Sequence, residues 1–418
     1  MSTNAPLKSI QDGLVFYYDT NNPKSYNGQP TVNLNSDPLA LGGNPGSVSW
    51  GGYEYNITRT SDLPVSSMRE ISPFWLKCVC NGPSSGRAAV LGVGGLSTGV
   101  DYCISSYVYS DDADITTVTW VSHNSGISVD YSAVTYGSSD RSTVKRIYRI
   151  FRSVAGSQLE VLQTNSNVTA GDTFYITGIQ CEQKSYPTQL VNGTRSNTQG
   201  LLDLTKRYTI DLTNAGFDSN ANITFNQPSN YTIATNIPIT SLPALSDFTF
   251  EIWFNPTAYP TVAPANQYNN TTRCGVLFGA TYYCGTALYW YGNSSGNAFT
   301  IYSYIRGTDS YRTTAGYNLT LNKYHHLVLV HSYTAGKLRL YVNGTLYSEV
   351  QGATAQYDSN LTGTAGNIGV SKAQVDGGGE ANYSHITGQV GEAKIYTKAL
   401  SSDEVSQNYY RSKSRYRL

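Results

Sequence analysis

The most regular alternation of apolar and polar residues in the chain surrounds the Asn343-Gly344 pair. On its N-terminal side every second residue is apolar and falls on one face of an extended strand: Leu338, Leu340 and Val342. An Asn-Gly pair accommodates the two positive φ angles of a type I′ hairpin turn. On the other side we expect Leu346 and Val350 to continue the apolar face, interrupted by Ser348. The pattern predicts a β-hairpin with one face on a core, and an antiparallel C-terminal half.

The same period of two recurs in short segments along the whole chain, between clusters of Gly, Ser, Asn and Asp. Further strands are expected at residues 13–18, 74–80, 115–121, 144–152, 174–181, 248–255, 324–331 and 388–396. One helix is expected at residues 402–410, where Ser401 as N-cap and Glu404 form a capping box. We therefore predict an all-β fold of two antiparallel β-sandwich (jelly-roll) domains with a short C-terminal helix.

Two stretches with the composition of turns or linkers divide the chain. A Pro/Asn/Gly-rich region runs through Pro30, and residues 191–200 have the composition of a connector. We expect an N-terminal strand and arm at residues 1–35, either separate or completing the C-terminal sandwich. One sandwich is then expected at residues 36–195 and the other at residues 196–418.

Composition narrows the classes of partner. Charged residues make up 13 % of the chain and sum to a formal net charge of zero, which argues against a nucleic-acid partner. The 35 tyrosines, among many Gly, Ser, Thr and Asn residues, suit a sugar-binding surface, although Tyr and Thr are also simply good strand formers. With no run of 18 apolar residues and no apolar h-region at the start, we expect neither membrane insertion nor a secretory signal.

Six cysteines are present: Cys78, Cys80, Cys103, Cys181, Cys274 and Cys284. Cys78 and Cys80 lie two apart in a predicted strand, so they point the same way and cannot easily pair with each other. We expect buried free thiols, with Cys274 and Cys284 as the pair to join if a disulfide forms. The spacing matches no zinc site.

The sequence offers no catalytic residues that we can assign. A glycoside hydrolase needs two carboxylates beside the scissile bond, but Glu251 and Glu392 each stand alone in their strands, where a solvated or hydrogen-bonded role is expected. His325 and His326 are adjacent strand residues on opposite faces, so they cannot chelate one ion together. We therefore expect a protein that is not an enzyme.

Two acidic clusters could supply oxygen ligands to calcium. Residues 110–114 contain three aspartates, which we interpret as a charged turn between strands. Asp376 and Glu380 flank three glycines that free backbone carbonyls, so this pair is the candidate for a calcium site, the one cofactor considered; the alternative that neither cluster binds a metal stays open.

Ring-rich segments are the candidates for ligand binding, because aromatic rings stack on the apolar faces of sugars. The candidate residues are Tyr282, Tyr283, Trp290, Tyr291, Tyr107, Tyr109 and Trp120. Alternation exposes only half of the rings in a strand, and core packing is the default expectation for both tryptophans.

Four segments in the C-terminal half carry a family resemblance. They are Phe248-Thr-Phe-Glu-Ile-Trp-Phe254, Tyr324-His-His-Leu-Val-Leu-Val330, Leu338-Arg-Leu-Tyr-Val-Asn-Gly344 and Gly391-Glu-Ala-Lys-Ile-Tyr-Thr-Lys-Ala-Leu-Ser401. In this order they resemble the laminin G-like, or concanavalin A-like, jelly roll. The family sometimes holds calcium near loops such as the one between Asp376 and Glu380. Residues 13–26 and 399–416 are similar to the version of this domain in structural proteins of tailed phages.

The middle of the chain carries a looser resemblance. Residues 171–183 and 186–195 are similar to the end of carbohydrate-binding-module sandwiches in phage fibres, with Cys181 where an aliphatic residue is usual. The middle sandwich then resembles an insertion between the opening strand and the jelly roll.

These resemblances imply a non-enzymatic virion structural protein of a tailed phage, in a fibre or decorating the capsid, that binds host surface glycans. The expected partners are other virion proteins, a host glycan and further copies of the chain, and the expected location is the virion, assembled in the host cytoplasm. Two alternatives stay open: a purely structural capsid cement without glycan binding, and a polysaccharide depolymerase.

Overall fold

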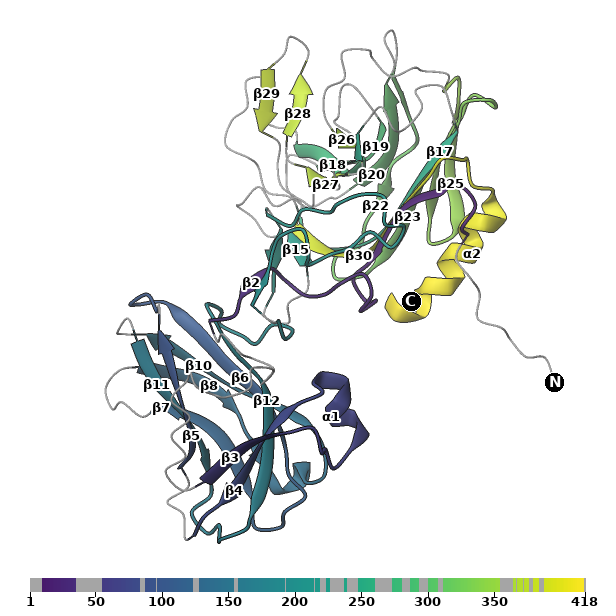
Figure 1. The fold of residues 1–418 in the computed structure, drawn as a ribbon. Helices are drawn as coiled ribbons and strands as arrows, with labels where there is room; N and C mark the ends of the chain where they lie inside the picture. The colour runs from purple at the N-terminus through teal and green to yellow at the C-terminus, as the bar shows by residue number, and fades with distance from the viewer. Residues whose placement is uncertain are drawn as a thin grey trace, which may run out of the picture. The chain divides into compact units, whose positions relative to one another are not determined.

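The computed structural model divides the chain into two compact units, which are described one at a time (Figure 1). The split unit comprises Met1–Gln29 and Asn197–Leu418, and the inserted unit comprises Pro30–Ser196. The boundary falls after Gln29, a few residues before the expected position. The structure describes residues 10–34, 55–82, 87–94, 96–122, 128–153, 157–191, 193–213, 215–218, 223–225, 237–238, 247–259, 273–279, 286–292, 300–306, 311–353, 364–365, 367–370, 372–375, 379–382 and 387–416.

The split unit is built on an eight-stranded antiparallel sheet, which we call the large sheet. Its order is β14-β15-β30-β17-β23-β24-β25, with β1 also paired to β30. The strands are β1 (Leu14–Asp19), β14 (Gly216–Phe217), β15 (Ile223–Phe225), β17 (Phe248–Ala258), β23 (His325–Ser332), β24 (Lys337–Val342), β25 (Thr345–Gln351) and β30 (Thr387–Tyr396). The first strand of the chain is therefore bonded to the last one.

A second antiparallel sheet packs against the large sheet, with the order β21-β20-β19-β18-β27 and β22 paired to β20. Its strands are β18 (Arg273–Gly279), β19 (Thr286–Gly292), β20 (Thr300–Arg306), β21 (Tyr311–Thr313), β22 (Tyr317–Asn318) and β27 (Asn367–Val370). Two short ladders pair β16 (Ile237–Pro238) with β26 (Thr364–Ala365), and β28 (Lys372–Val375) with β29 (Gly379–Asn382). Phe250 and Phe278 meet across the core, with ring centroids 5.3 Å apart.

The predicted hairpin forms as β24 and β25, and Asn343 and Gly344 have φ angles of 51° and 79°, as a type I′ turn requires. The prediction for Leu346 is wrong. The register shifts after Leu340, so that Leu346 pairs with Tyr341 and Tyr347 is the extra residue of a β-bulge. Leu346 is consequently exposed.

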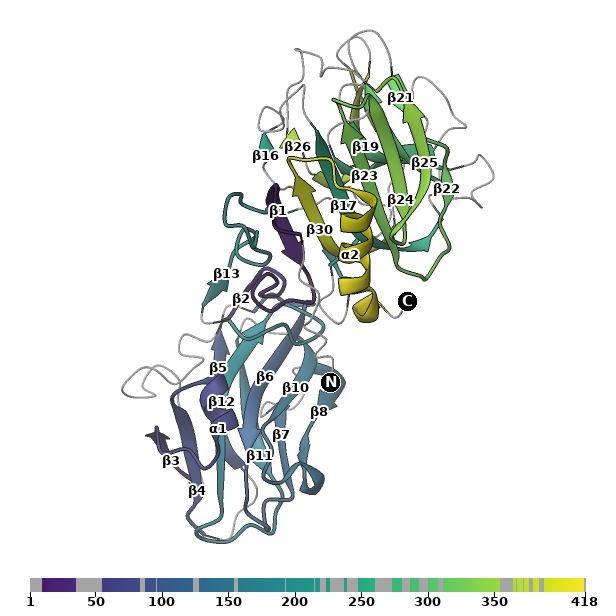
Figure 2. The ribbon, with the colours of Figure 1, turned by 90° about the vertical axis from the view of Figure 1, so that its right-hand side faces the viewer.

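The predicted C-terminal helix is confirmed as α2 (Ser402–Ser412), followed by the 3₁₀ turn η3 (Lys413–Tyr416). Ser401 and Glu404 form the predicted capping box. The helix lies across the face of the large sheet that points away from the core, and Val405 packs there against Val328, Tyr341 and Tyr396 (Figure 2). This face is therefore not open to water where the helix covers it.

The inserted unit is a second antiparallel sandwich, with sheets ordered β3-β4-β12-β6-β10-β8 and β5-β11-β7-β9. Its elements are β2 (Thr31–Val32), β3 (Tyr55–Thr60), α1 (Ser66–Ile71), β4 (Trp75–Cys80), β5 (Arg87–Gly94), β6 (Asp101–Tyr109), β7 (Thr117–Ser122), β8 (Ser128–Val134), β9 (Tyr136–Gly137), η1 (Ser138–Asp140), β10 (Lys145–Ser153), β11 (Ser157–Thr164), β12 (Thr173–Glu182) and β13 (Thr194–Arg195). The helix α1, which the sequence pattern does not predict, places Met68 against Trp75. The predicted all-β class with one C-terminal helix is thus confirmed, with this one short addition.

The four cysteines of the inserted unit are unpaired and buried, as predicted: Cys78, Cys80, Cys103 and Cys181. Burial raises the pKa of the Cys78 thiol. Cys284 lies outside the described residues, so the pair that it would form with Cys274 is not described. Among the residues described, no helix is long and apolar enough to cross a membrane.

Candidate functional site

Four of the predicted ring residues fall in or beside β19 of the split unit. Tyr282 and Tyr283 lie outside the residues that the structure describes. Trp290 and Tyr291 belong to β19, and their backbones pair with Gly275 and Cys274 of β18.

Two of the three ring residues predicted in the inserted unit are too buried to stack on a ligand. Trp120 is buried and its Nε1 donates a hydrogen bond to Ser106 Oγ at 3.1 Å, and Tyr109 is buried. Both complete the packing of the unit, so neither can bind a ligand; for Trp120 this confirms the default expectation of core packing, and for Tyr109 the ligand prediction is wrong. Tyr107 is half-buried, and the Arg146 guanidinium lies 5.5 Å from its ring centroid.

Sequence reasoning missed an exposed group of rings on the split unit. Tyr347 is 47 % exposed, and its ring meets that of Tyr317 edge-on, with the centroids 5.1 Å apart. The Tyr347 hydroxyl donates a hydrogen bond to the Gly316 carbonyl at 3.0 Å. On the other side of Gly316 lies the half-buried ring of Tyr302, so close that a Cβ at position 316 would be 2.4 Å from it.

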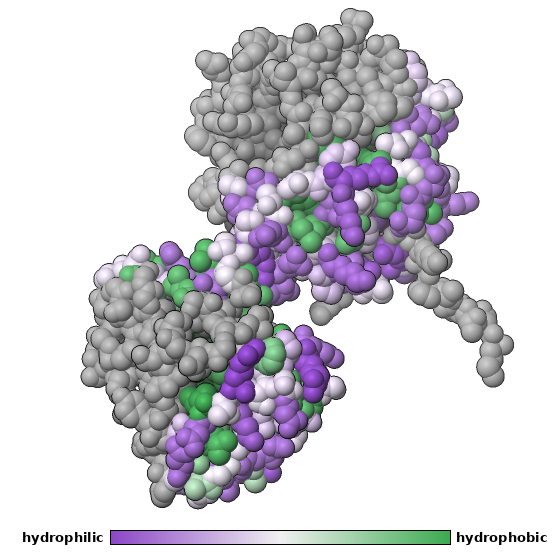
Figure 3. Space-filling model, viewed as in Figure 1, coloured by the Kyte–Doolittle hydropathy of each residue, from purple (hydrophilic) through white to green (hydrophobic). Residues whose placement is uncertain are grey.

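We call Tyr302, Tyr317 and Tyr347 the tyrosine surface. Its glycine lets the backbone approach one ring closely, and the bulge in β25 puts Tyr347 where the regular register would not. Such a surface offers an apolar ring face beside polar backbone groups, the combination that a sugar ring requires. Hydrophilic and hydrophobic residues are interspersed over the described part of the surface that Figure 3 shows.

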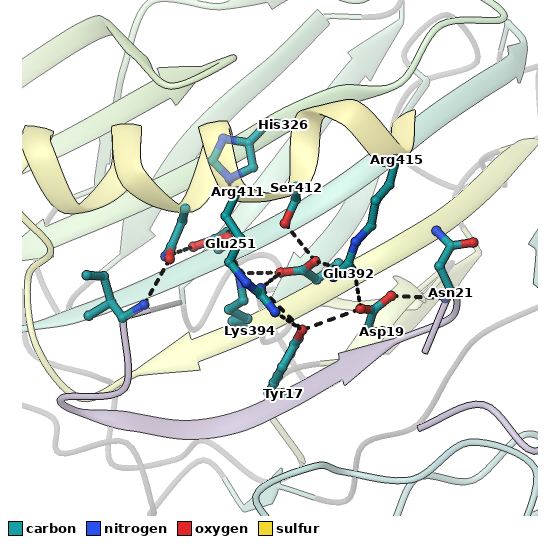
Figure 4. Close-up of polar contacts among 12 residues, drawn as sticks. Tyr17, Asp19, Asn21, Glu251, His326, Glu392, Lys394, Arg411, Ser412 and Arg415 are labelled. Carbon is teal, nitrogen blue, oxygen red and sulfur yellow. Dashed lines mark hydrogen bonds and ion pairs between the residues drawn. The ribbon is translucent and has the colours of Figure 1, made fainter. Parts of the chain in front are cut away.

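The two strand carboxylates that might suggest hydrolysis lie together beneath α2 (Figure 4). Glu251 of β17 and Glu392 of β30 are both buried, and Lys394 forms an ion pair with each of them. The distance from Lys394 Nζ to Glu251 Oε1 is 2.6 Å. The expectation of hydrogen-bonded carboxylates is confirmed and that of solvated ones is wrong, because the helix covers this face of the sheet.

The two ends of the chain complete this charge cluster. Arg415 forms an ion pair with Asp19 of β1, and Arg411 Nη1 lies 3.5 Å from Glu392 Oε1. Ser412 Oγ donates a hydrogen bond to Glu392 Oε2 at 3.0 Å. Three buried carboxylates thus face three cations whose charges balance theirs, with Lys394 buried and the two arginines partly exposed.

The pKa of Glu251 shows that this charge cluster stabilises the fold. Burial alone would raise the pKa of Glu251, but Lys394 and then His326, whose Nε2 lies 3.3 Å from Glu251 Oε1, lower it to about 2. A general acid of a glycosidase needs the opposite, a raised pKa and access to the substrate. Glu251 therefore lacks both properties of a general acid, and the cluster joins the helix to the sheet.

The acidic residues occur in a different arrangement from the expected one. Asp376 lies outside the described residues, and Glu380 is described only as part of the β29 backbone. In the inserted unit, residues 110–114 connect β6 and β7, as the turn interpretation predicts. The fold adds Asp172, and one carboxylate oxygen from each of Asp112, Asp114 and Asp172 lies within 4.8 Å of the others.

Hydrogen bonds within the loops already occupy part of this acidic cluster. Asp112 accepts one from the backbone N–H of Thr173 at 3.0 Å, and Asp172 accepts one from Thr169 at 2.6 Å. Calcium takes six to eight oxygen ligands, of which these carboxylates could supply three. No pattern in the sequence pointed to Asp172, which reaches the cluster only through strand pairing.

Comparison with known proteins identifies the class of the larger part of the split unit. Residues 226–406 match the protein family described as the concanavalin A-like lectin/glucanases superfamily, in its laminin G form. The split unit therefore contains a concanavalin A-like lectin/laminin G domain. No curated protein matches the chain.

Several solved structures are similar to part of the chain. The receptor-binding domain of botulinum neurotoxin type G is 14 % identical over 51 % of this chain and 49 % of that chain, with a TM-score of 0.33. The binding domain of botulinum neurotoxin DC in complex with SialylT is 10 % identical over 51 % and 50 %, with a TM-score of 0.36. A heptameric SAP-like pentraxin from Limulus polyphemus is 18 % identical over 41 % and 71 %, with a TM-score of 0.29. The chain thus spans about half the length of the toxin domains.

Proposed function

We propose that this protein binds carbohydrate without cleaving it. The observation that carries the proposal is the pairing of a concanavalin A-like lectin/laminin G domain with buried, neutralised strand carboxylates. Glu251 and Glu392 are buried beneath α2, where both pair with Lys394 and Glu392 also pairs with Arg411, so no polysaccharide reaches them. A depolymerase would need a different pair of acids.

The tyrosine surface is the place on the described part of the split unit where a sugar would bind. Tyr347 offers an open ring face, Tyr317 supports it edge-on, and backbone groups at Gly316 lie beside them. Ring stacking contributes affinity at low entropic cost because the tyrosines are already held in place.

A glycan array with the full-length protein tests this proposal. Tyr347→Ala should lower the affinity for any captured glycan by about three- to tenfold, which corresponds to the loss of one aromatic contact. Tyr410→Ala is the matched control, since Tyr410 is 54 % exposed but lies on α2 beside Lys413. Absence of any bound glycan, or equal losses in the two variants, would contradict the proposal.

The virion setting belongs to the same proposal. The segments that resemble structural proteins of tailed phages, residues 13–26 and 399–416, are joined in the fold by the Asp19–Arg415 ion pair. We place the protein on a phage particle, as a fibre or capsid decoration, in contact with other virion proteins and further copies of itself.

Immunogold labelling and copy number on purified particles test this setting. Labelled tails or heads are expected, and particles without the chain would remove the virion part of the proposal. A head-decorating protein that captures no glycan would instead support the purely structural alternative.

A further inference from the structure

A cavity of about 350 Å³ opens in the inserted unit, far in sequence from the tyrosine surface. It is lined by Thr31, Val32, Leu34, Tyr102, Gln183 and Lys184. Its volume lies in the lower part of the range of small-molecule sites. Two of its aliphatic residues are unusually open: Val32 is 52 % exposed and Leu34 is 38 % exposed.

The walls of the cavity are firmly built. Leu34 is fixed by a backbone hydrogen bond from its N–H to the Cys181 carbonyl at 2.8 Å, and the neighbouring Asn33 side chain accepts one from the Cys181 N–H at 3.0 Å. The buried ring of Tyr102 stacks on Phe151. The Tyr102 hydroxyl accepts a hydrogen bond from the Ser97 N–H at 2.8 Å, which fixes this residue in the wall.

Lys184 brings a positive charge that no described residue pairs with. The nearest acid is Glu182, but its carboxylate already accepts from Thr31 Oγ1, Gln180 Nε2 and both the N–H and the hydroxyl of Thr188. Four bonds fill the acceptor positions of a carboxylate. Burial lowers the pKa of Lys184, and the attraction of Glu182 only partly offsets this. Glu182 keeps its negative charge, but it has no acceptor position left for the Lys184 amine, which can therefore donate to an anionic ligand.

We propose that this cavity binds a carboxylate-bearing sugar unit of an acidic polysaccharide. Lys184 pairs with the carboxylate, Val32 and Leu34 cover the apolar face of the ring, and the exposed Gln183 bonds its OH groups. This site is in the inserted unit, so it stands independently of the tyrosine surface and of the lectin domain.

Binding of oligogalacturonate, oligoglucuronate and oligosialate to the full-length protein, measured by calorimetry, tests this site. Methyl-esterified oligogalacturonate is the matched neutral ligand, because esterification removes the charge and keeps the rings. We expect at least one acidic oligosaccharide to bind, its ester to bind roughly ten- to a hundredfold more weakly, and Lys184→Met to lose the same factor. Lys184→Arg should retain most of the affinity, as should Lys145→Met, whose amine pairs with Asp140 in the same unit.

Two control measurements separate binding in this cavity from a loss of folding and from binding at the tyrosine surface. Lys184→Met should leave the thermal midpoint of the inserted unit unchanged or raise it, since it removes an unpaired, partly desolvated cation. Tyr347→Ala should leave binding of the acidic sugar unchanged, so failure of one site is distinguishable from failure of the other. Equal binding of acid and ester, no binding of any acidic sugar, or stronger binding of a poly-glutamate peptide would overturn the assignment.

Discussion

At the scale of single residues, Lys394 has the least replaceable role in the split unit. Its amine lies between two carboxylates that are themselves buried. If the amine is removed, water cannot reach either carboxylate to solvate its charge. We expect Lys394→Met to lower the free energy of unfolding by about 3–5 kcal/mol, the cost of leaving a buried charge unpaired. Denaturant unfolding of the full-length protein, followed at the transition of the split unit, measures this loss.

Lys337→Met is the control within the same unit. Lys337 pairs with Glu349 on a partly exposed strand, so this substitution should cost no more than about 1 kcal/mol. Equal costs for the two lysines would mean that burial adds nothing to the Lys394 pairs, contrary to their geometry.

The low pKa of Glu251 predicts how stability depends on pH. Because this pKa falls from 4.5 to about 2 on folding, the ionised carboxylate stabilises the fold above the unfolded value. The stabilisation is lost as the pH falls from about 4.5 to 2, and it amounts to roughly 3 kcal/mol. Thermal unfolding across this range should show a steep decline.

Glu251→Gln tests the origin of that decline. The variant should be less stable at pH 7 but should flatten the decline between pH 4.5 and 2. Glu349→Gln should change the slope little, because Glu349 is open to solvent and its ion pairs are screened. A decline unaltered in Glu251→Gln would assign the pH dependence to other carboxylates.

At the scale of elements, the close packing of the β24–β25 turn against the C-terminal helix requires a glycine at position 344. Gly344 has a φ of +79°, and a Cβ there would lie 2.8 Å from the Tyr409 ring on α2. We expect Gly344→Ala to lower the free energy of unfolding by about 2–4 kcal/mol. About 1 kcal/mol of this comes from backbone strain and the rest from displacing the Tyr409 ring. Denaturant unfolding checks the value.

Gly352→Ala isolates the backbone contribution in the same unit. Gly352 has a φ of +77°, but a Cβ there would meet only the flexible end of Arg312, at 3.3 Å. This variant should cost about 1 kcal/mol. If Gly344→Ala costs no more than Gly352→Ala, the contact between turn and helix has no energetic weight.

The elements themselves could be predicted because period-two patterning follows from burying one face of a sheet. What the pattern could not show is what covers the other face. Glu251, Glu392 and Lys394 occupy the positions of water-facing residues, yet α2 encloses them because Arg411 and Arg415 complete their charges. A local alternation contains no information about a helix placed on the sheet from further along the chain.

The candidate sites were the least predictable part for the same reason. Tyr347 is exposed through a one-residue bulge, and a shift of one residue exchanges the two faces of a strand. Tyr109 could not be distinguished from an exposed ring in the sequence, yet it is buried in the inserted unit, as is Trp120, for which core packing was the default expectation. The Lys184 cavity brings Thr31 near Gln183, a proximity that depends on the hydrogen bonds from Thr31 to Glu182 and from Leu34 to Cys181.

At the scale of the whole molecule, the split unit is closed by the two ends of its own chain. Arg415 pairs with Asp19 across 396 positions, and the Ile10 N–H donates to Asn408 Oδ1 at 3.1 Å. The chain leaves the split unit and returns to it at neighbouring points, since the Asn27 N–H donates a hydrogen bond to the Gly200 carbonyl at 2.8 Å. Insertion there leaves the pairing of β1 with β30 intact.

This topology predicts that the inserted unit is dispensable for folding of the split unit, whereas the N-terminal strand is not. Residues 1–29 joined to 197–418 by a short Gly/Ser linker should unfold cooperatively, because the linker only closes a gap that is already narrow. Residues 197–418 alone lack β1, which exposes the edge of β30 and leaves Arg415 without Asp19, so they should be aggregated or much less stable. Thermal unfolding followed by circular dichroism, together with size-exclusion chromatography, compares the two chains. Equal stability would show that β1 contributes nothing to the stability of the sheet.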